Sequence, residues 1–131
     1  MMREILFRGK RKGNGEWICG DLIHDWSDHN TKPVIKIYNN TGSFTVIPET
    51  VGQYTGLTDK NGKKIFEGDI VIDKYSKEKF GFVGVVIYNP KLTQFQIYSD
   101  KQPDYVVDLG SRRDSVKIIG NIHDDKLEDF E

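Results

Sequence analysis

The sequence predicts a mainly β, barrel-like fold, and three observations predict it. Short apolar segments rich in β-branched residues recur roughly every eight to twelve positions, separated by Gly, Asn and Pro. Asn61-Gly62 lies between apolar-containing flanks and favours a type I′ hairpin turn, with positive φ at both residues. Gly68 interrupts the next apolar run and indicates a second sharp reversal of the backbone. These features specify shape rather than chemistry.

The first half of the chain predicts two hairpins. Residues 4–8 and 17–22 alternate apolar and polar side chains around a Gly-Asn-Gly turn, and residues 34–38 and 44–47 repeat this arrangement around an Asn- and Gly-rich turn. Pro48 ends the fourth strand, because proline fixes φ and removes a backbone donor. A short helical turn is expected directly after it, with a threonine cap.

The second half, residues 64–131, predicts a small SH3-like barrel against which the N-terminal hairpins pack. Its expected strands are residues 70–73, 81–88, 95–97, 106–109 and 116–122. A short C-terminal helix is expected over residues 124–130, where Leu127 and Phe130 share a face. We expect one domain over residues 1–131, with a possible subdivision into 1–63 and 64–131.

Composition limits the class of protein. The 131 residues are enough for one core, and 37% hydrophobic with 30% charged residues is typical of a soluble globular chain. No apolar run approaches the ~20 residues of a membrane span, and the apolar run near the N-terminus is too short for a secretory signal. We therefore expect action in the cytoplasm, away from any membrane. Cys19 is the only cysteine, so no disulfide forms within the chain, and it is expected to be a small buried hydrophobe.

Charge is balanced overall but uneven along the chain. The net charge of −1 does not favour strong attraction of the whole molecule to nucleic acid. The head is basic and the tail is acidic, and the residues concerned are Arg3, Arg8, Lys10, Arg11 and Lys12, then Asp124, Asp125, Glu128, Asp129 and Glu131. These ends are expected either to be solvated and mobile or to attract each other within or between chains, which makes a homo-oligomer one expectation.

Two basic segments with aromatic residues are candidate macromolecule-binding sites. The first contains Arg8, Lys10, Arg11 and Lys12 with Trp17, and the second contains Lys74, Tyr75, Lys77 and Lys79. Cations attract phosphates and rings stack on bases, so either segment is an alternative nucleic-acid site. The competing interpretation places Trp17 in the core, because it alternates with a cysteine in a strand. The acidic tail opposes nucleic-acid binding.

Candidate catalytic and metal-binding groups are sparse. His24, Asp25, Asp28 and His29 carry ligand chemistry within six residues, but their spacing matches no established metal site and an exposed polar loop explains them. No metal and no cofactor is expected. Glu67 and Asp69 are too close in sequence, across a glycine bend, to define a substrate gap. The motif residues with a structural role are Gly56, Asp59, Asn61, Gly62, Glu67, Gly68 and Asp69.

Four segments together resemble the YopX family of phage and prophage proteins. They read MREILFRGKRKGNGEWICGDLI, VIPETVGQYTGLTDKNGKKIFEGDIV, GVVIYN and VKIIGNIHD, and they span nearly the whole chain. The resemblance implies a phage or prophage origin, a β-rich fold and no established biochemical activity. The tail departs from the Asn-Pro-Glu-Leu-Leu ending of relatives and reads HDDKL at residues 123–127.

The residues and the resemblance together predict a non-enzymatic phage accessory protein. Its β scaffold is expected to bind another macromolecule or to self-associate. The first alternative is a nucleic-acid-binding module that uses the basic head or the tip at residues 74–79. The second alternative is a metal-dependent enzyme built on His24 and His29.

Overall fold

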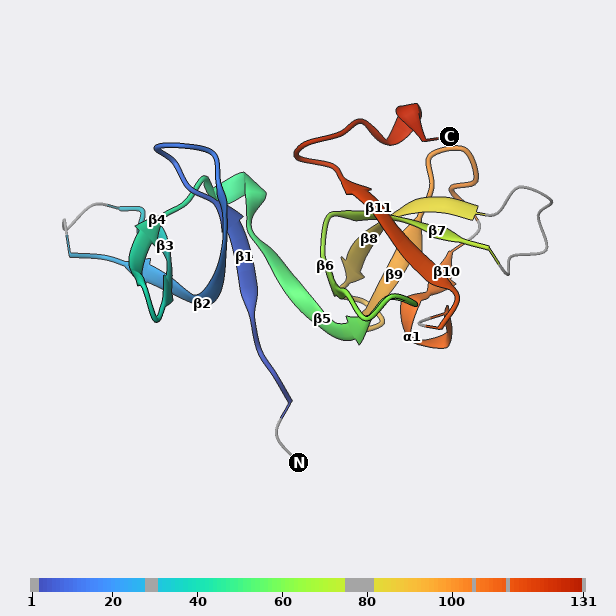
Figure 1. Ribbon diagram of the computed structural model, residues 1–131, viewed down its shortest axis with the longest axis horizontal. Coiled ribbons are helices and arrows are strands. Elements are labelled where there is room, and N and C mark those ends of the chain that lie inside the picture. Colours follow the sequence, from blue (N-terminus) through green and yellow to red (C-terminus); the bar gives the residue numbers. More distant parts are fainter. Residues whose placement is uncertain (1–2, 28–30, 75–81, 105, 113, 131) are drawn as a thin grey trace. The chain divides into compact units, whose positions relative to one another are not determined.

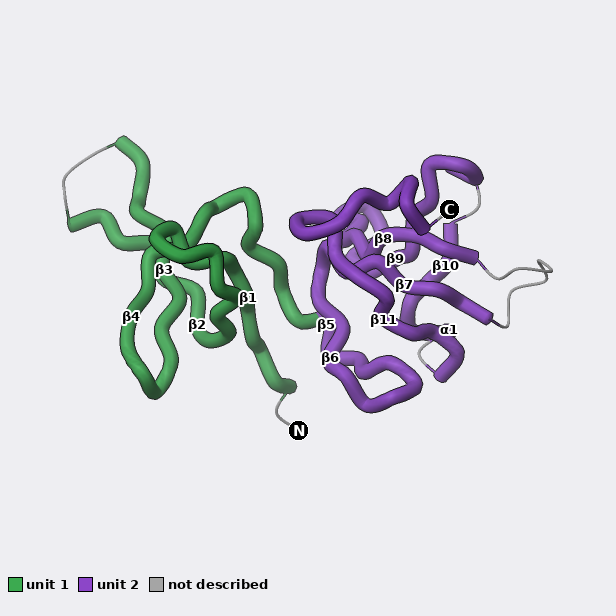
Figure 2. Tube along the Cα trace, turned by 45° about the horizontal axis from the view of Figure 1, so that its top comes forward, with its two compact units in different colours: residues 1–54 green, residues 55–131 purple. Residues whose placement is uncertain are grey.

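The structure is a computed structural model that describes residues 3–27, 31–74, 82–104, 106–112 and 114–130. It is mainly β, with 53% strand and 9% helix, which confirms the predicted fold class (Figure 1). The chain forms two compact units, Met1–Tyr54 (unit 1) and Thr55–Glu131 (unit 2) (Figure 2). The expectation of one domain with a possible boundary at residue 63 stays a prediction.

Unit 1 is built from the two predicted hairpins. Its strands are antiparallel neighbours in chain order: β1 (Phe7–Lys10), β2 (Trp17–Asp25), β3 (Val34–Asn39) and β4 (Gly42–Thr45). β2 is long enough to pair first with β1 and then with β3. β5 (Gly52–Thr58) begins in unit 1 beside β1 and continues into unit 2, where it neighbours β6 (Lys64–Phe66).

The end of β4 rejoins the end of β1. Arg11 and Val46 form an antiparallel bridge, the Lys12 amide donates to the Thr45 carbonyl at 3.0 Å, and the Ile47 amide donates to the Lys10 carbonyl at 2.8 Å. The four strands therefore form a closed circuit of hydrogen-bonded neighbours. β1 is hydrogen-bonded along both sides, so residues 7–10 of the basic head lie in a paired strand and not in a mobile end, which was one of the two expectations.

The predicted helical turn after the second hairpin is η1 (Pro48–Thr50), one turn of 3-10 helix. Thr50 does not cap its start. The Thr50 hydroxyl instead donates to the Ile47 carbonyl at 2.6 Å and accepts the Lys10 amide at 2.9 Å. The Thr50 hydroxyl thus accepts the amide of Lys10 in β1. Lys10 lies between the β1 residues that pair with β5 and Arg11, which pairs with Val46 after β4.

The core of unit 1 is small and depends on glycine. Ile37 and Val46 are buried, and a Cβ at Gly9 would lie 3.1 Å from the Val46 Cβ. Gly20 takes the inward position on β2, so the residues on either side of it face outward. The prediction that Cys19 is buried is wrong, because Cys19 lies on that outer face and is exposed.

Unit 2 contains a five-stranded antiparallel sheet in the order β10-β9-β8-β7-β11. The strands are β7 (Asp69–Asp73), β8 (Phe82–Asn89), β9 (Gln94–Tyr98), β10 (Val107–Asp108) and β11 (Val116–Asn121). The predicted strand over residues 106–109 is only two residues long, because the chain turns into the helix α1 (Leu109–Arg112). At the C-terminus, the expected helix is reduced to the 3-10 turn η2 (Leu127–Asp129).

One apolar cluster holds unit 2 together. Its buried members are Ile65, Val71, Phe82, Val86, Ile97, Val107, Leu109 and Val116. They come from every strand of the five-stranded sheet, from β6 and from α1. Burial of this continuous apolar surface is the main force that stabilises the unit.

The hairpin turn at Asn61-Gly62 is not type I′. Gly62 has a φ of 81°, but among the described non-glycine residues only Thr93 has a positive φ. The Gly62 amide donates to the Asp59 carbonyl at 2.9 Å, and the Asp59 amide donates to the Lys63 carbonyl at 2.8 Å. This pattern is typical of a three-residue hairpin loop that ends in a left-handed glycine. The predicted reversal at Gly68 is present, with a φ of 89°.

Candidate functional site

The basic head forms a cation–aromatic cluster on unit 1. The Arg8 guanidinium lies 4.7 Å and the Lys10 ammonium 5.6 Å from the centroid of the Trp17 ring, while the Arg11 guanidinium lies 4.6 Å from that of Phe44. Both distances to Trp17 are within the range of an attractive cation–π interaction. We name Arg8, Lys10, Arg11 and Lys12, together with Trp17, the basic cluster.

The strand register explains this geometry. Lys10 stands opposite Trp17 and Arg8 stands opposite Cys19 in the β1–β2 pair. Side chains alternate across a strand, so Arg8 and Lys10 share the outer face with Trp17 while Gly9 between them faces the core. Trp17 is half-buried beneath these cations. Trp17 is therefore not one of the buried core residues, because part of its ring remains exposed on the outer face.

The outer face continues along β2 beyond the basic cluster. Asp21 stands opposite Tyr38 and Ile23 stands opposite Lys36, and Tyr38 is 51% exposed. Asp25 ends the row, with its carboxylate 2.7 Å from the Lys36 ammonium. The hydrogen bond from Lys36, aided by bonds from Ser27, holds the pKa of Asp25 well below its usual range. The face therefore presents cations, rings, the carboxylate of Asp21, and the carboxylate of Asp25 paired with Lys36.

The second predicted basic segment is only partly described. Lys74 is exposed directly after β7. Tyr75, Lys77 and Lys79 lie outside the described residues. Their assignment to a binding site stays a prediction.

The candidate metal cluster is not supported by its described members. His24 and Asp25 are neighbours in β2, so their side chains lie on opposite faces of the strand. Asp25 is also bonded to Lys36. Asp28 and His29 lie outside the described residues. Within the described part of the chain, no group of three or more His, Cys, Asp or Glu side chains is placed to hold a metal ion.

Asp59 ties the hairpin loop to the last strand. Its Oδ1 accepts the Asn61 and Lys63 amides, each at 2.9 Å, and its Oδ2 accepts the Ile118 amide at 3.0 Å. Burial disfavours the charged carboxylate, but the bonds from Ile118, Lys63 and Asn61 outweigh burial and lower the pKa of Asp59. The predicted turn role is correct, and the contact with β11, 59 residues away, adds to it.

The carboxylate pair at Glu67 and Asp69 also has a structural arrangement. Asp69 is 2% exposed, and its Oδ2 accepts the Phe66 amide at 2.8 Å across the Gly68 bend. Glu67 is half-buried. The buried position of Asp69 leaves no approach for a substrate between the two carboxylates.

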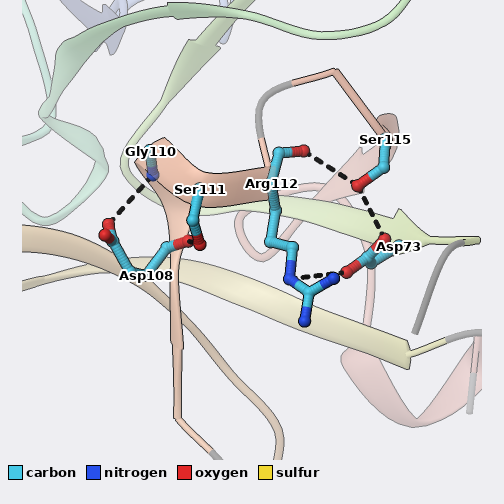
Figure 3. A network of polar contacts seen from close by, with 6 residues as sticks. All are labelled: Asp73, Asp108, Gly110, Ser111, Arg112 and Ser115. Atoms are coloured by element: carbon cyan, nitrogen blue, oxygen red, sulfur yellow. Dashed lines mark hydrogen bonds and ion pairs between the residues drawn. The ribbon is translucent and has the colours of Figure 1, made fainter. Parts of the chain in front are cut away.

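Sequence reasoning missed a buried polar network at the end of β7 (Figure 3). The Ser115 hydroxyl donates to Asp73 Oδ1 at 2.8 Å, and the Arg112 Nε lies 3.6 Å from Asp73 Oδ2. Asp108 starts the neighbouring α1 turn by accepting the Gly110 amide at 3.0 Å. Ser115 and Asp73 are 42 residues apart and carry no motif, so only the β7–β11 pairing brings them together. The network fastens α1 and β11 to β7, and both partners of the hydroxyl bond are buried.

None of the helices in the described part of the chain is long and apolar enough to cross a membrane. No curated protein matches the chain. Among solved structures, the chain is similar to "Crystal structure of protein EF1440 from Enterococcus faecalis", with 23% sequence identity and a TM-score of 0.52 over 93% of this chain and 95% of that one. This likeness shows a shared fold. The family model YopX, described as "YopX protein", matches residues 6–127, and the chain therefore belongs to the YopX family.

Proposed function

We propose that this protein is a non-enzymatic accessory protein of a phage or prophage that binds another macromolecule through the basic cluster of unit 1. The observation that carries the proposal is the position of two cations over Trp17 on the outer face. β1 is hydrogen-bonded on both sides, which fixes the backbone from which these cations project. A fixed cation loses less conformational entropy on binding than a cation on a mobile tail.

Unit 2 serves as the scaffold in this proposal. Its strand order, with a short helix between β10 and β11, supports the prediction of a small SH3-like barrel. Its described buried carboxylates bond to its own backbone and side chains, as Asp59, Asp69 and Asp73 illustrate. A likeness of fold alone names no partner. Because these carboxylates of unit 2 are bonded within the unit, the proposal places the partner at unit 1. The proposed site of action is the cytoplasm of the host.

Affinity capture from infected host cells tests the proposal. The tagged full chain is compared with an Arg8→Gln/Lys10→Gln variant and with a Lys60→Gln/Lys91→Gln variant, which removes two exposed cations from unit 2. We expect a retained macromolecule that is lost with the first variant and kept with the second. Equal retention by all three chains contradicts a role for the basic cluster.

Self-association is a second way in which the basic cluster could bind a macromolecule, with another copy of the chain as the partner. The tail presents exposed carboxylates at Asp125, Glu128 and Asp129, opposite in sign to the basic cluster. Size-exclusion chromatography with light scattering at low and high salt separates this case, because exposed charges are screened by salt. Oligomers that dissociate as salt rises support it, and a monomer at every salt concentration removes it.

A further inference from the structure

We infer that the ligand of the basic cluster is single-stranded nucleic acid, bound along the outer face of β1 and β2. The inference rests on the proposed function and names the class of macromolecule that this site accepts.

Charge complementarity is the first argument. Residues 8–12 carry four cations, and Arg8 and Lys10 of these lie over Trp17 on the outer face. Arg11 pairs with the buried Val46 and lies over Phe44, so it projects from the other face of the strand. On the same outer face, the charge of Asp25 is matched by Lys36 at 2.7 Å. Asp21 is the acid of this face that stands nearest in register to the cluster. A row of cations of this density attracts a polyanion, whose phosphates repeat along its backbone.

The rings favour a single strand over a duplex. Tyr38 is 51% exposed on the outer face, and an exposed ring gives a base a surface on which to stack. Bases in a duplex are already stacked on each other, so an aromatic residue on a sheet face reads unpaired bases. Trp17 has a different role from Tyr38. Its ring contacts Arg8 and Lys10 and holds these cations in position to bind phosphates.

The same face fits a protein partner less well. The centre of a protein–protein interface is apolar and depleted of lysine and aspartate. Here Cys19 and Asp21 separate Trp17 from Ile23 along β2, and Lys10 stands directly opposite Trp17. The outer face thus lacks a continuous apolar centre while it concentrates positive charge at one end.

Fluorescence anisotropy with the full chain tests the inference. The probes are labelled dT12, labelled rU12 and a labelled 12-base-pair DNA duplex, titrated at several salt concentrations. We expect both single strands to bind more tightly than the duplex, and affinity to fall as salt rises. If Arg8, Lys10 and Lys12 each contact a phosphate, the slope of log K against log salt is about −2 for a single strand.

Single substitutions assign the binding to the cluster. Lys12→Gln and Lys10→Gln are each expected to weaken dT12 binding roughly fivefold at low salt, and to reduce the salt slope by about 0.7. Asp21→Asn removes the repelling carboxylate and is expected to strengthen binding by a similar factor. The Lys60→Gln/Lys91→Gln variant is the matched control and leaves binding unchanged. Thermal melts of each variant show whether the fold is retained.

The sole cysteine gives an independent readout that needs no substitution. Cys19 is exposed and stands opposite Arg8, so a strand bound across the cluster covers its thiol. We expect saturating dT12 to slow alkylation of Cys19 severalfold, and the duplex to slow it less. Unchanged alkylation while dT12 is bound places the strand elsewhere and overturns the inference.

The outcomes separate this inference from the proposed function. Absence of dT12 and rU12 binding at low salt overturns the inference, as does duplex binding that is equal to or tighter than single-strand binding. If a captured protein is then lost with Arg8→Gln/Lys10→Gln, the proposed function stands with a protein partner. If nothing captured depends on these residues, both fail.

Discussion

The two units of this chain place their charged residues in opposite ways. Unit 2 buries Asp59, Asp69 and Asp73, each 5% exposed or less, and bonds them to its own amides and to a serine hydroxyl. Unit 1 holds Arg8 and Lys10, both half-buried, over Trp17 on its outer face. Charges inside a fold serve the fold, because an ion taken from water must be matched by close partners. The cations of unit 1 keep part of their side chains exposed on the outer face.

The two units also differ in the size of their apolar cores. Unit 2 has a continuous cluster of eight buried apolar residues, whereas the most buried apolar side chains of unit 1 are Ile37 and Val46, packed beside Gly9. A smaller apolar cluster provides less stabilisation by burial. We therefore expect unit 2 to respond more strongly than unit 1 to the loss of an apolar side chain.

A matched pair of isoleucines tests this difference and has the largest expected effect. Ile97 in unit 2 and Ile37 in unit 1 are both fully buried. We expect Ile97→Ala to lower the free energy of unfolding by about 4 kcal/mol and Ile37→Ala by about 2.5 kcal/mol, since fewer apolar neighbours are lost around Ile37. Urea unfolding monitored by circular dichroism measures both. Equal costs, or a larger cost at Ile37, contradict the ranking of the two cores.

Gly20 tests whether unit 1 depends on close backbone approach instead. A Cβ at Gly20 would lie 2.2 Å from the Tyr38 carbonyl oxygen, and a backbone atom cannot rotate away. Gly20→Ala is expected to lower the free energy of unfolding by about 3 kcal/mol, because β2 and β3 must separate. Gly62→Ala in unit 2 is the control. It has open space but a φ of 81°, so its expected cost is about 1 kcal/mol.

Local residue patterns predicted the strands well and the environment of each face less well. The two hairpins and η1 follow from alternation, turn residues and Pro48, all of which act within a few residues. The burial of Cys19 was mispredicted because its hydrophobicity suggests the core. The register instead gives the inward position to Gly20, where only a glycine fits against Tyr38. That constraint comes from β3 and has no trace in residues 17–22.

Asp59 tests the internal use of charge in unit 2. Asp59→Ala removes the acceptors of three amides, and water can reach those of the exposed Asn61 and Lys63 more easily than that of Ile118. We expect the free energy of unfolding to fall by about 2 kcal/mol. Asp59→Asn keeps one carbonyl oxygen and is expected to cost about half as much. Equal costs for the two substitutions exclude the amide bonds as the cause.

The lowered pKa of Asp59 sets the pH range of this contribution. A carboxyl whose pKa is lower in the folded protein adds stability that is complete above its ordinary pKa of 3.8 and is lost as the pH falls below it. The difference in unfolding free energy between the wild type and Asp59→Asn should therefore be constant at neutral pH and shrink below about pH 4. A difference that does not change from pH 7 to pH 2.5 contradicts this assignment.

The candidate site was predictable in its residues but not in its geometry. The density of Arg and Lys in residues 8–12, near a tryptophan, is visible in the sequence. The sequence does not show that these cations project from a strand that is bonded on both sides, because that arrangement requires the Arg11–Val46 bridge between distant segments. The pairing of Asp73 with Ser115 depends in the same way on a strand register set by the whole of unit 2.

The Asp25–Lys36 pair has the smallest expected effect and tests the surface side of the comparison. Lys36→Met removes the strongest cause of the low pKa of Asp25, so that pKa should rise toward its ordinary 3.8 in an NMR titration of the carboxyl carbon. Bonds from Ser27 remain and keep it somewhat below that value. The unfolding free energy should hardly change at neutral pH, because exposed ion pairs are screened by water and salt. A large loss of stability would mean that unit 1, like unit 2, uses its charges to hold its fold, and the contrast between the units would fail.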